Sequence, residues 1–333
     1  MNERVFLDLM IARLPELSCR EKLLLSETPG AELDLIRKSK SDIEYIIKRQ
    51  LPSFWDAAAI QKMAEHDAKT AELRGIGILS VHDGEYPPLL REIYDPPLLL
   101  FYKGRLPNPE KPLAAIVGTR KPGPGALAQT YEIARDLGRS GISVVSGLAL
   151  GIDAMAHRGN CEGGGFTVAV LGSGLDEVYP SSNRPLARRI LDTGGALFSE
   201  YPPGTGPRKW NFPARNRIIS GLARGVLIAQ APQKSGALIT AGFALEQNRE
   251  LWVMSAGVAD NGDTEKFDCR GTMKLAEDGA GIIRCSGDIL QAWNISGQPD
   301  TEEQRTDGET YTANKSTGNH LAGALAESLG ISL

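Results

Sequence analysis

The sequence predicts an α/β fold: a Rossmann-like parallel sheet with helices on both faces, preceded by a small all-helical N-terminal domain. Two observations lead to this prediction. Apolar residues repeat at helical spacing through the first 74 positions, and from residue 114 onward short continuous apolar runs alternate with helix-length segments. Continuous apolar strands are typical of a sheet that is buried on both faces, and helices between successive strands favour parallel pairing.

Residues 1–75 are expected to form the helical domain. Val5, Leu9 and Leu14 recur at intervals close to the helical turn, and Ser18 has the side chain of an N-cap for a second helix. Further helical patterns cover residues 42–49 and 53–73.

Residues 76–295 are expected to form the sheet domain. Its strands are the apolar runs at residues 114–117, 143–145, 167–171, 196–198, 225–229 and 251–254, and helical patterns at 126–139, 185–191 and 238–248 separate several of them. Because the carboxyl ends of parallel strands share one edge, a ligand is expected at the turns that follow the strands. After about residue 294 the chain turns polar, so residues 296–333 are expected to form a disordered linker with one short helix at 320–329.

The composition is that of an ordinary globular protein and excludes several classes. Hydrophobic residues make up 41% and charged residues 23% of the 333 positions, and no apolar run approaches the roughly 18 residues of a membrane span. The first apolar stretch contains Asp8, unlike a signal peptide, so the cytoplasm is the expected location. The four cysteines are too scattered for a zinc site or a disulfide framework, and neither a metal nor a cofactor is expected.

The net charge of −4 argues against a protein that holds nucleic acid by bulk charge, but the charges are unevenly distributed. Residues 201–245 contain no Asp or Glu, and neither do residues 111–131. The basic residues in these two segments include Arg120, Lys121, Arg208, Lys209, Arg215, Arg217, Arg224 and Lys234. They lie among glycines and aromatic residues, which favours a local anion-binding patch over a merely solvated face.

Glycine-rich turns follow four of the expected strands. They contain Gly118-Thr119-Arg120, Ser146-Gly147, Gly172-Ser173-Gly174 and Ser235-Gly236. Glycine lets backbone N–H groups approach an anion, and a helix N-terminus adds a favourable dipole, so the four turns together predict a phosphate-binding groove. Each turn alone fits a tight strand–helix connection equally well, and none completes a dinucleotide-binding or P-loop motif.

Residues 208–222 form the most informative segment. Pro213 suits the first turn of a helix that continues to Leu222. Around its start lie Lys209, Trp210, Phe212, Arg215, Asn216 and Arg217. Cations interleaved with aromatic rings are typical of single-stranded nucleic-acid sites, where charges follow the backbone and rings stack on unpaired bases. The alternative is that the two aromatic residues belong to the core.

Asp153 and His157 stand four residues apart on an expected helix. They could form an acid/base pair, but Asp153 follows Gly151-Ile152 as a natural N-cap, and we expect that role. The sequence offers no Ser/His/Asp order and no metal-ligand cluster, so an enzyme is not expected.

Together these segments resemble the DNA-processing protein A (DprA, or Smf) family over roughly residues 76–290. The matching motifs are Tyr86-Pro87-Pro88, Asp95-Pro96-Pro97, Gly118-Thr119-Arg120, Ser146-Gly147-Leu148-Ala149, Gly151-Ile152-Asp153, Gly172-Ser173-Gly174, Tyr179-Pro180, Ser199-Glu200-Tyr201-Pro202, Phe212-Pro213 and the run from Ser235 to Thr240. The resemblance implies an extended Rossmann domain that binds single-stranded DNA. It also implies a homodimer that protects incoming DNA and loads a RecA-type recombinase onto it during natural transformation.

The residues expected to bind DNA are Arg120, Ser146, Gly147, Gly172, Lys209, Phe212, Arg215, Asn216, Arg217, Ser235 and Gly236. Three features depart from the family's pattern. Met254-Ser255-Ala256-Gly257 stands where the family usually shows Val-Pro-Gly. Gln230 stands where a Glu is expected, and the segment after residue 294 is too short and polar for the winged helix that the family often carries. The alternative function is that of a nucleotide-processing hydrolase of the phosphoribohydrolase class. That class has a Pro-Gly-Gly-x-Gly-Thr turn with a Glu close behind, whereas here the turn at Ser235 lacks those glycines and Glu246 falls later.

Overall fold

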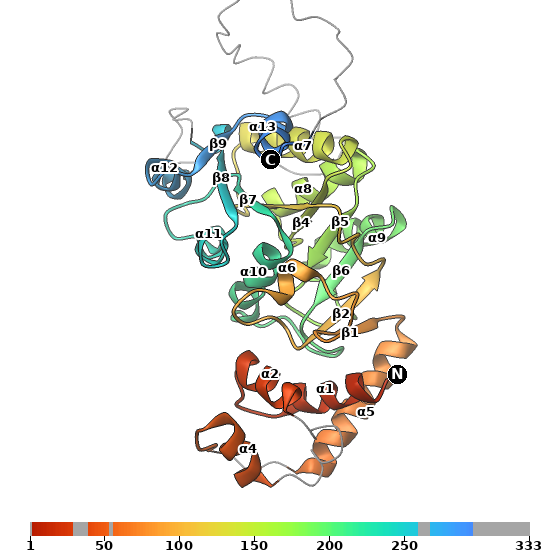
Figure 1. The fold of residues 1–333 in the computed structure, drawn as a ribbon. Coiled ribbons are helices and arrows are strands. Elements are labelled where there is room, and N and C mark those ends of the chain that lie inside the picture. The colour runs from red at the N-terminus through yellow and green to blue at the C-terminus, as the bar shows by residue number, and fades with distance from the viewer. Residues whose placement is uncertain (1, 29–38, 53–55, 259–266, 296–333) are drawn as a thin grey trace, which may run out of the picture.

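The computed structural model describes residues 2–28, 39–52, 56–258 and 267–295 (Figure 1). The expectations for residues 296–333, a linker with one short helix, lie outside the described residues, as does the start of the helical pattern at 53–55.

The described chain begins with the helices α1 (Glu3–Arg13), α2 (Cys19–Glu27), α4 (Lys40–Ile47) and α5 (Ala57–Leu73). A polar side chain caps the start of each: Asn2, Ser18, Ser39 and Asp56. Ser18 belongs to a capping box, because the Glu21 carboxylate in turn accepts the Ser18 N–H at 2.7 Å. The predicted helices, and the predicted cap at Ser18, are confirmed.

In the described part of the chain, nine strands form one sheet in the order β1-β2-β6-β5-β4-β3-β7-β8-β9. They are β1 (Gly77–Ser80), β2 (Leu99–Gly104), β3 (Leu113–Val117), β4 (Ser143–Ser146), β5 (Thr167–Val170), β6 (Ala196–Ser199), β7 (Gly225–Ile228), β8 (Glu250–Met254) and β9 (Gly281–Ile283). All neighbours from β6 to β9 are parallel. The chain runs outward from β3 to β6 and then returns to β7 on the other side of β3, which is a doubly wound topology. The predicted Rossmann-like sheet is therefore confirmed.

Three strands of the sheet were not predicted. β1 and β2 are antiparallel, and β2 extends the sheet by pairing with β6, from Phe101 opposite Ser199 to Gly104 opposite Ala196. β9 is a three-residue strand at the opposite edge. Such short strands carry little periodicity, and the pairing of β2 with a strand so distant in sequence has no local signal.

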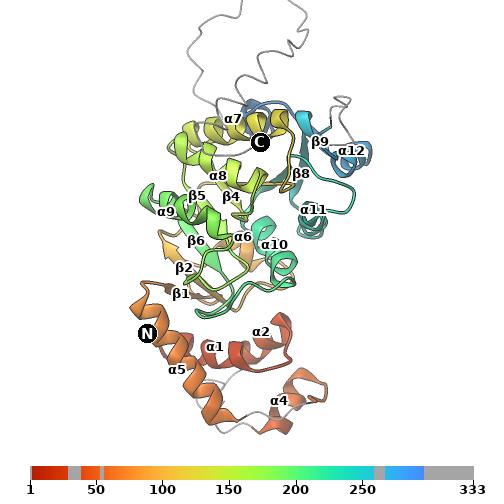
Figure 2. The same cartoon turned by 180° about the vertical axis from the view of Figure 1, so that it is seen from behind.

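Helices cover both faces of the sheet (Figures 1 and 2). On one side lie α7 (Pro124–Arg139), α8 (Ile152–Glu162), α9 (Arg184–Asp192) and α13 (Ser286–Ala292), and on the other α10 (Asn211–Leu222) and α11 (Gly236–Glu246). Within β3, Ala114 and Ile116 join the apolar cluster that includes α7, whereas Ala115 and Val117 join the one that includes α10. The remaining short elements are α6 (Pro88–Arg91), η1 (Ser181–Asn183), η2 (Ser255–Gly257) and α12 (Arg270–Glu277).

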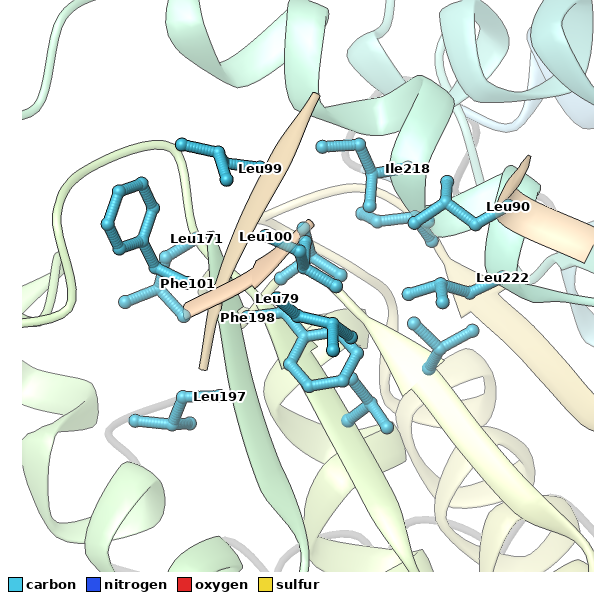
Figure 3. Packing of buried hydrophobic residues seen from close by; sticks show 14 of the residues in the cluster. Leu79, Leu90, Leu99, Leu100, Phe101, Leu171, Leu197, Phe198, Ile218 and Leu222 are labelled. Atoms are coloured by element: carbon cyan, nitrogen blue, oxygen red, sulfur yellow. The ribbon is translucent and has the colours of Figure 1, made fainter. Parts of the chain in front are cut away.

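The larger apolar cluster continues from the sheet into the N-terminal helices. Leu79, Leu100 and Phe198, from β1, β2 and β6, pack beside Ile218 of α10 (Figure 3). Leu9 of α1 belongs to the same cluster and is 1% exposed. The helices at the start of the chain are thus packed against the antiparallel end of the sheet. The same apolar cluster includes residues of α10.

Candidate functional site

The carboxyl ends of β3, β4 and β5 meet the N-terminal turns of α10. Asn211 donates from Nδ2 to the Gly172 carbonyl at 2.9 Å, and Arg215 donates to the Gly147 carbonyl at 2.7 Å. The Arg120 guanidinium carbon lies 5.9 Å from the centre of the Phe212 ring. The structure therefore brings together residues that lie up to 95 positions apart, at the sheet edge where the sequence predicted a ligand.

Arg215 forms the floor of this site. Its side chain is 4% exposed, and one guanidinium nitrogen donates to the carbonyls of both Gly147 and Val170. The pKa of Arg215 is lowered to about 10. Burial is the main cause, the Asp153 carboxylate opposes it, and the Arg120 charge acts in the same direction as burial. The group still carries its charge at neutral pH. A Cβ on Gly147 would collide with this guanidinium, so glycine is required where the loop crosses it.

Asp153 corrects two predictions. The N-cap of α8 is Gly151, at φ 76°, and not Asp153. The Asp153 carboxylate instead accepts the Gly147 N–H at 3.1 Å and backbone hydrogen bonds from Gly118 and Ala149. Amide groups that were expected to bind phosphate at this turn thus already bind an internal anion. Glycine here serves the close packing of the loop rather than an open cradle for phosphate.

His157 does not form an acid/base pair with Asp153. Its Nδ1 lies 2.8 Å from the Thr167 hydroxyl in β5. The ring is fully buried, and burial together with the Arg215 charge lowers its pKa to about 3. It is therefore a neutral core side chain, and the alternative of a catalytic pair at these two positions is wrong.

Arg217 is directed away from the Gly147 loop, although the sequence analysis expects it to bind DNA together with Arg120 and Arg215. Its guanidinium forms a fork with both carboxylate oxygens of Glu200, at 2.9 and 2.6 Å. Burial would lower its pKa, but the Glu200 charge outweighs this effect and raises it. Arg217 therefore ties α10 to the end of β6, and its charge is already neutralised.

Two further contacts extend the Arg217 cluster. Nε donates to the Asp95 carboxylate at 2.9 Å, and a terminal nitrogen lies 3.4 Å from the Cys19 sulfur at the start of α2. Arg217 thus reaches from the sheet domain to the N-terminal helices, and its side chain is only 5% exposed.

Three other predicted site residues position the loops. Ser146 is buried and donates to the Ile116 carbonyl at 2.6 Å, which ties β4 to β3. Asn216 donates to the Gly236 carbonyl at 3.1 Å, which ties α10 to the turn after β7. Ser235 caps α11 by accepting the Ala237 N–H. Gly236, in contrast to Gly147, has open space where a Cβ would lie.

Exposed cations and rings surround the buried floor. The exposed basic residues of the two acid-free segments are Lys111, Arg120, Lys121, Arg208, Lys209, Arg224 and Lys234. Of these, only Arg224 has a carboxylate within 4.0 Å in the described part of the chain. Trp210 is 67% exposed, with Arg208 over its ring at 5.7 Å, so the alternative of a core role is wrong for Trp210. Lys209 and Arg120 are thus available to an external anion.

Tyr179 and Gln230 are site residues that the sequence analysis did not select. The Tyr179 ring lies 5.4 Å from the Phe212 ring and is 44% exposed. The Gln230 side chain accepts the Gly123 N–H at 2.9 Å and donates to the Phe267 carbonyl at 3.2 Å, so a neutral amide satisfies both partners where a carboxylate would satisfy one. For Tyr179, the Tyr179-Pro180 motif was the signal in the sequence that could have identified it.

Among the described residues, no group of three or more His, Cys, Asp or Glu side chains is arranged to hold a metal ion. None of the described helices combines the length and the apolar character that crossing a bilayer requires.

The chain matches the model of one protein family, DNA recombination-mediator protein A, over residues 77–294. Protein Smf of Synechocystis sp. is 43% identical over 234 residues, which cover 69% of this chain and 56% of that protein. DNA processing protein DprA of Bacillus subtilis is 39% identical over 219 residues, which cover 66% of this chain and 71% of that protein. The matched region is therefore little more than half of the Synechocystis protein.

Two solved structures are similar in fold and sequence. The X-ray structure of DNA processing protein A from Streptococcus pneumoniae superposes with a TM-score of 0.69 at 32% identity, and covers 87% of this chain and 98% of that one. A structure of DNA processing protein A from Helicobacter pylori, described for its single-stranded DNA binding mode, gives a TM-score of 0.57 at 30% identity and covers 66% of this chain and 95% of that one.

Proposed function

Because the chain belongs to the DNA recombination-mediator protein A family, the family of DNA processing protein A and Smf, we propose that it binds single-stranded DNA at the carboxyl edge of its sheet, without catalysis. The observation that carries the proposal is the convergence of Arg120, Phe212 and Arg215 over three strand ends. An exposed cation beside an aromatic ring suits a flexible chain of phosphates and unpaired bases. A rigid duplex hides its bases inside.

The proposed site uses three kinds of residue. Arg120 and Lys209 are exposed and would contact phosphates. Phe212 would contact bases, while Arg215 supplies positive potential from below and holds the Gly147 loop in place. The other predicted residues, Ser146, Gly147, Gly172, Asn216, Ser235 and Gly236, would shape the loops. Arg217 is left out because Glu200 and Asp95 already hold its charge.

The alternative, a nucleotide-processing hydrolase, finds less support. It would need a carboxylate close behind the glycine turn at Ser235. Glu246 is the last residue of α11, and ten residues of helical rise separate it from Gly236 by about 15 Å. Asp153, a buried carboxyl group near the loops, is engaged by backbone N–H groups. A DNA-binding role does not require the Glu246 or the Asp153 carboxyl group to take part in a reaction.

The wider role rests on the family. We propose that the protein acts in the cytoplasm as a homodimer, protects incoming single strands during natural transformation or recombination, and loads a RecA-type recombinase onto them. Sedimentation of the protein alone and with a RecA-type recombinase tests the last two parts. A protein that stays monomeric and never co-sediments with the recombinase would contradict them and leave DNA binding intact.

The direct test is a titration of the full chain against a labelled oligothymidylate, the matching duplex and thymidine monophosphate, followed by fluorescence anisotropy at several salt concentrations. The single strand is expected to bind far more tightly than the other two. Arg120→Ala combined with Lys209→Ala should weaken binding and reduce the salt slope by about 1.4, since each phosphate contact to a single strand contributes roughly 0.7.

Two exposed cations elsewhere provide the matched control. Lys62 lies on α5 and Arg188 on α9, so the double variant Lys62→Ala with Arg188→Ala removes the same charge from other surfaces. It should keep the wild-type salt slope. Equal slopes for the two double variants would mean that binding depends on net charge alone and would overturn the proposed site. Release of free base from AMP, lost in Glu246→Gln, would instead establish the hydrolase.

A further inference from the structure

Tyr179 presents an accessible aromatic face in contact with Phe212, next to the buried floor of the site. It lies in the segment that joins β5 to η1, and 44% of the residue is exposed. Its ring centre is 5.4 Å from that of Phe212, with 45° between the ring planes. Large aromatic side chains are normally buried because exposure to water forfeits about 1.5–3 kcal/mol, so an exposed ring in a tight cluster calls for an explanation.

Phe212, by comparison, is less exposed than Tyr179 and has neighbours on several sides. Gly172 lies so close that a Cβ there would be 3.1 Å from a Phe212 ring atom. Tyr179 and the Arg120 guanidinium approach the same ring. A base cannot enter between Tyr179 and Phe212, since contact with both would need about 3.5–4.0 Å on each of its faces. Tyr179, the more exposed of the two rings, therefore offers the larger free face to a base.

The segment that carries Tyr179 is held by hydrogen bonds at several points. Asn183 donates from Nδ2 to the carbonyls of Leu148 and Ala149, at 2.9 and 3.2 Å, which joins the segment to the turn after β4. On its other side, the Asp176 carboxylate accepts the Gly204 N–H at 2.9 Å. A ring mounted in this way loses little conformational freedom when it binds a partner, which favours affinity.

From these contacts we infer that Tyr179 is a base-stacking residue of the single-stranded DNA site, beside Phe212. The inference rests on the proposed function and deepens it by assigning the contact with an unpaired nucleobase. With a base on Tyr179, the adjoining phosphate lies toward Arg120, which approaches the neighbouring Phe212 ring. Stacking is available on every base, so the contact distinguishes unpaired from paired DNA rather than one sequence from another.

The experiment measures binding of an oligothymidylate that contains one 2-aminopurine, whose fluorescence falls when the base stacks on a ring. Tyr179→Ala is expected to weaken binding about 5- to 150-fold, as loss of one stacked base does, and to abolish the fluorescence decrease. The salt slope should stay at the wild-type value, because no phosphate contact is lost. Tyr179→Phe keeps the ring and should behave as wild type.

Two further variants separate stacking from other effects. Tyr45→Ala removes a tyrosine that is 86% exposed on α4 and should leave both signals unchanged. Tyr179→Leu keeps an apolar side chain of similar reach but has no aromatic face, so it should resemble Tyr179→Ala. Thermal unfolding of each variant shows that the fold is retained.

The outcomes are distinguishable. Wild-type protein that binds no single strand would overturn the proposed function itself. Wild-type binding with Tyr179→Ala indistinguishable from Tyr45→Ala, or Tyr179→Leu with full affinity and full fluorescence decrease, would overturn only the role of Tyr179.

Discussion

Replacing Arg217 by methionine tests whether this arginine holds the structure together or binds DNA. The methionine side chain keeps much of the apolar stem and removes the guanidinium. Arg217 lies two residues after Arg215 on α10, yet it contacts Glu200, Asp95 and Cys19 and not the Gly147 loop. We therefore expect Arg217→Met to lower the free energy of unfolding and to leave the DNA affinity of the folded protein unchanged.

The magnitude follows from the exposure of the two carboxylates. The Glu200 side chain is 13% exposed, and removing its partner leaves a buried charge alone, which costs about 3–5 kcal/mol. The Asp95 side chain is 37% exposed, so its pair with Arg217 adds at most about 1 kcal/mol. A loss of about 3–5 kcal/mol in a domain of this size lowers Tm by about 6–20 °C.

Urea unfolding followed by circular dichroism measures the stability, and oligothymidylate anisotropy at a temperature where the variant is folded measures the affinity. Adding Glu200→Gln removes the stranded charge, so the double variant should recover at least about 0.5 kcal/mol of the summed single losses. A stable Arg217→Met protein that no longer binds the oligonucleotide would refute the reasoning, because it would place Arg217 in the DNA site.

Two more predictions concern the interior of the site. Gly147→Ala pushes a methyl group into the Arg215 guanidinium. It should cost about 3 kcal/mol through lost charge-assisted hydrogen bonds and should weaken oligonucleotide binding. Gly236→Ala, which meets open space, should leave the free energy of unfolding unchanged, and equal effects of the two variants in urea unfolding would contradict the packing described. His157 has a folded-state pKa of about 3, below its unfolded value of about 6.5, so the folded state binds fewer protons and stability falls by about 4–5 kcal/mol as pH drops through that window. His157→Gln should flatten this dependence in unfolding measured from pH 7 to 3, and an unchanged profile would count against it.

The parallel sheet could be predicted because each of its strands is visible in a short stretch of sequence. Each buried strand is a continuous apolar run, and the rule that carboxyl ends share an edge places the turns at Gly118, Gly147 and Gly172 together. The geometry of Arg120 and Phe212 agrees with that rule. The antiparallel strands escaped because β1 and β2 depend on a partner, β6, that no pattern within the segment specifies.

The errors at the site have a geometric cause. Residues two apart on a helix are related by a rotation of about 200°, so their side chains point to nearly opposite sides. Arg215 and Arg217 therefore do not share one surface, although both closely follow Phe212. Asp153 was misassigned because a carboxylate near a helix start suits an N-cap, and its actual partners, Gly118 and Gly147, belong to other turns. Tyr179 was missed because exposure is a property of the fold.

The pairing of β2 with β6 also has a consequence for folding during synthesis. About 90 residues separate Gly104 from Ala196, so β2 leaves the ribosome long before its partner exists. At translation rates of about 5–20 residues per second, it waits roughly 5–20 s. During that interval Leu99, Leu100 and Phe101 can be shielded by β1 and the helices already made, or by a chaperone. The early helices and β1 are thus placed to cover this strand until β6, its second neighbour, has been made.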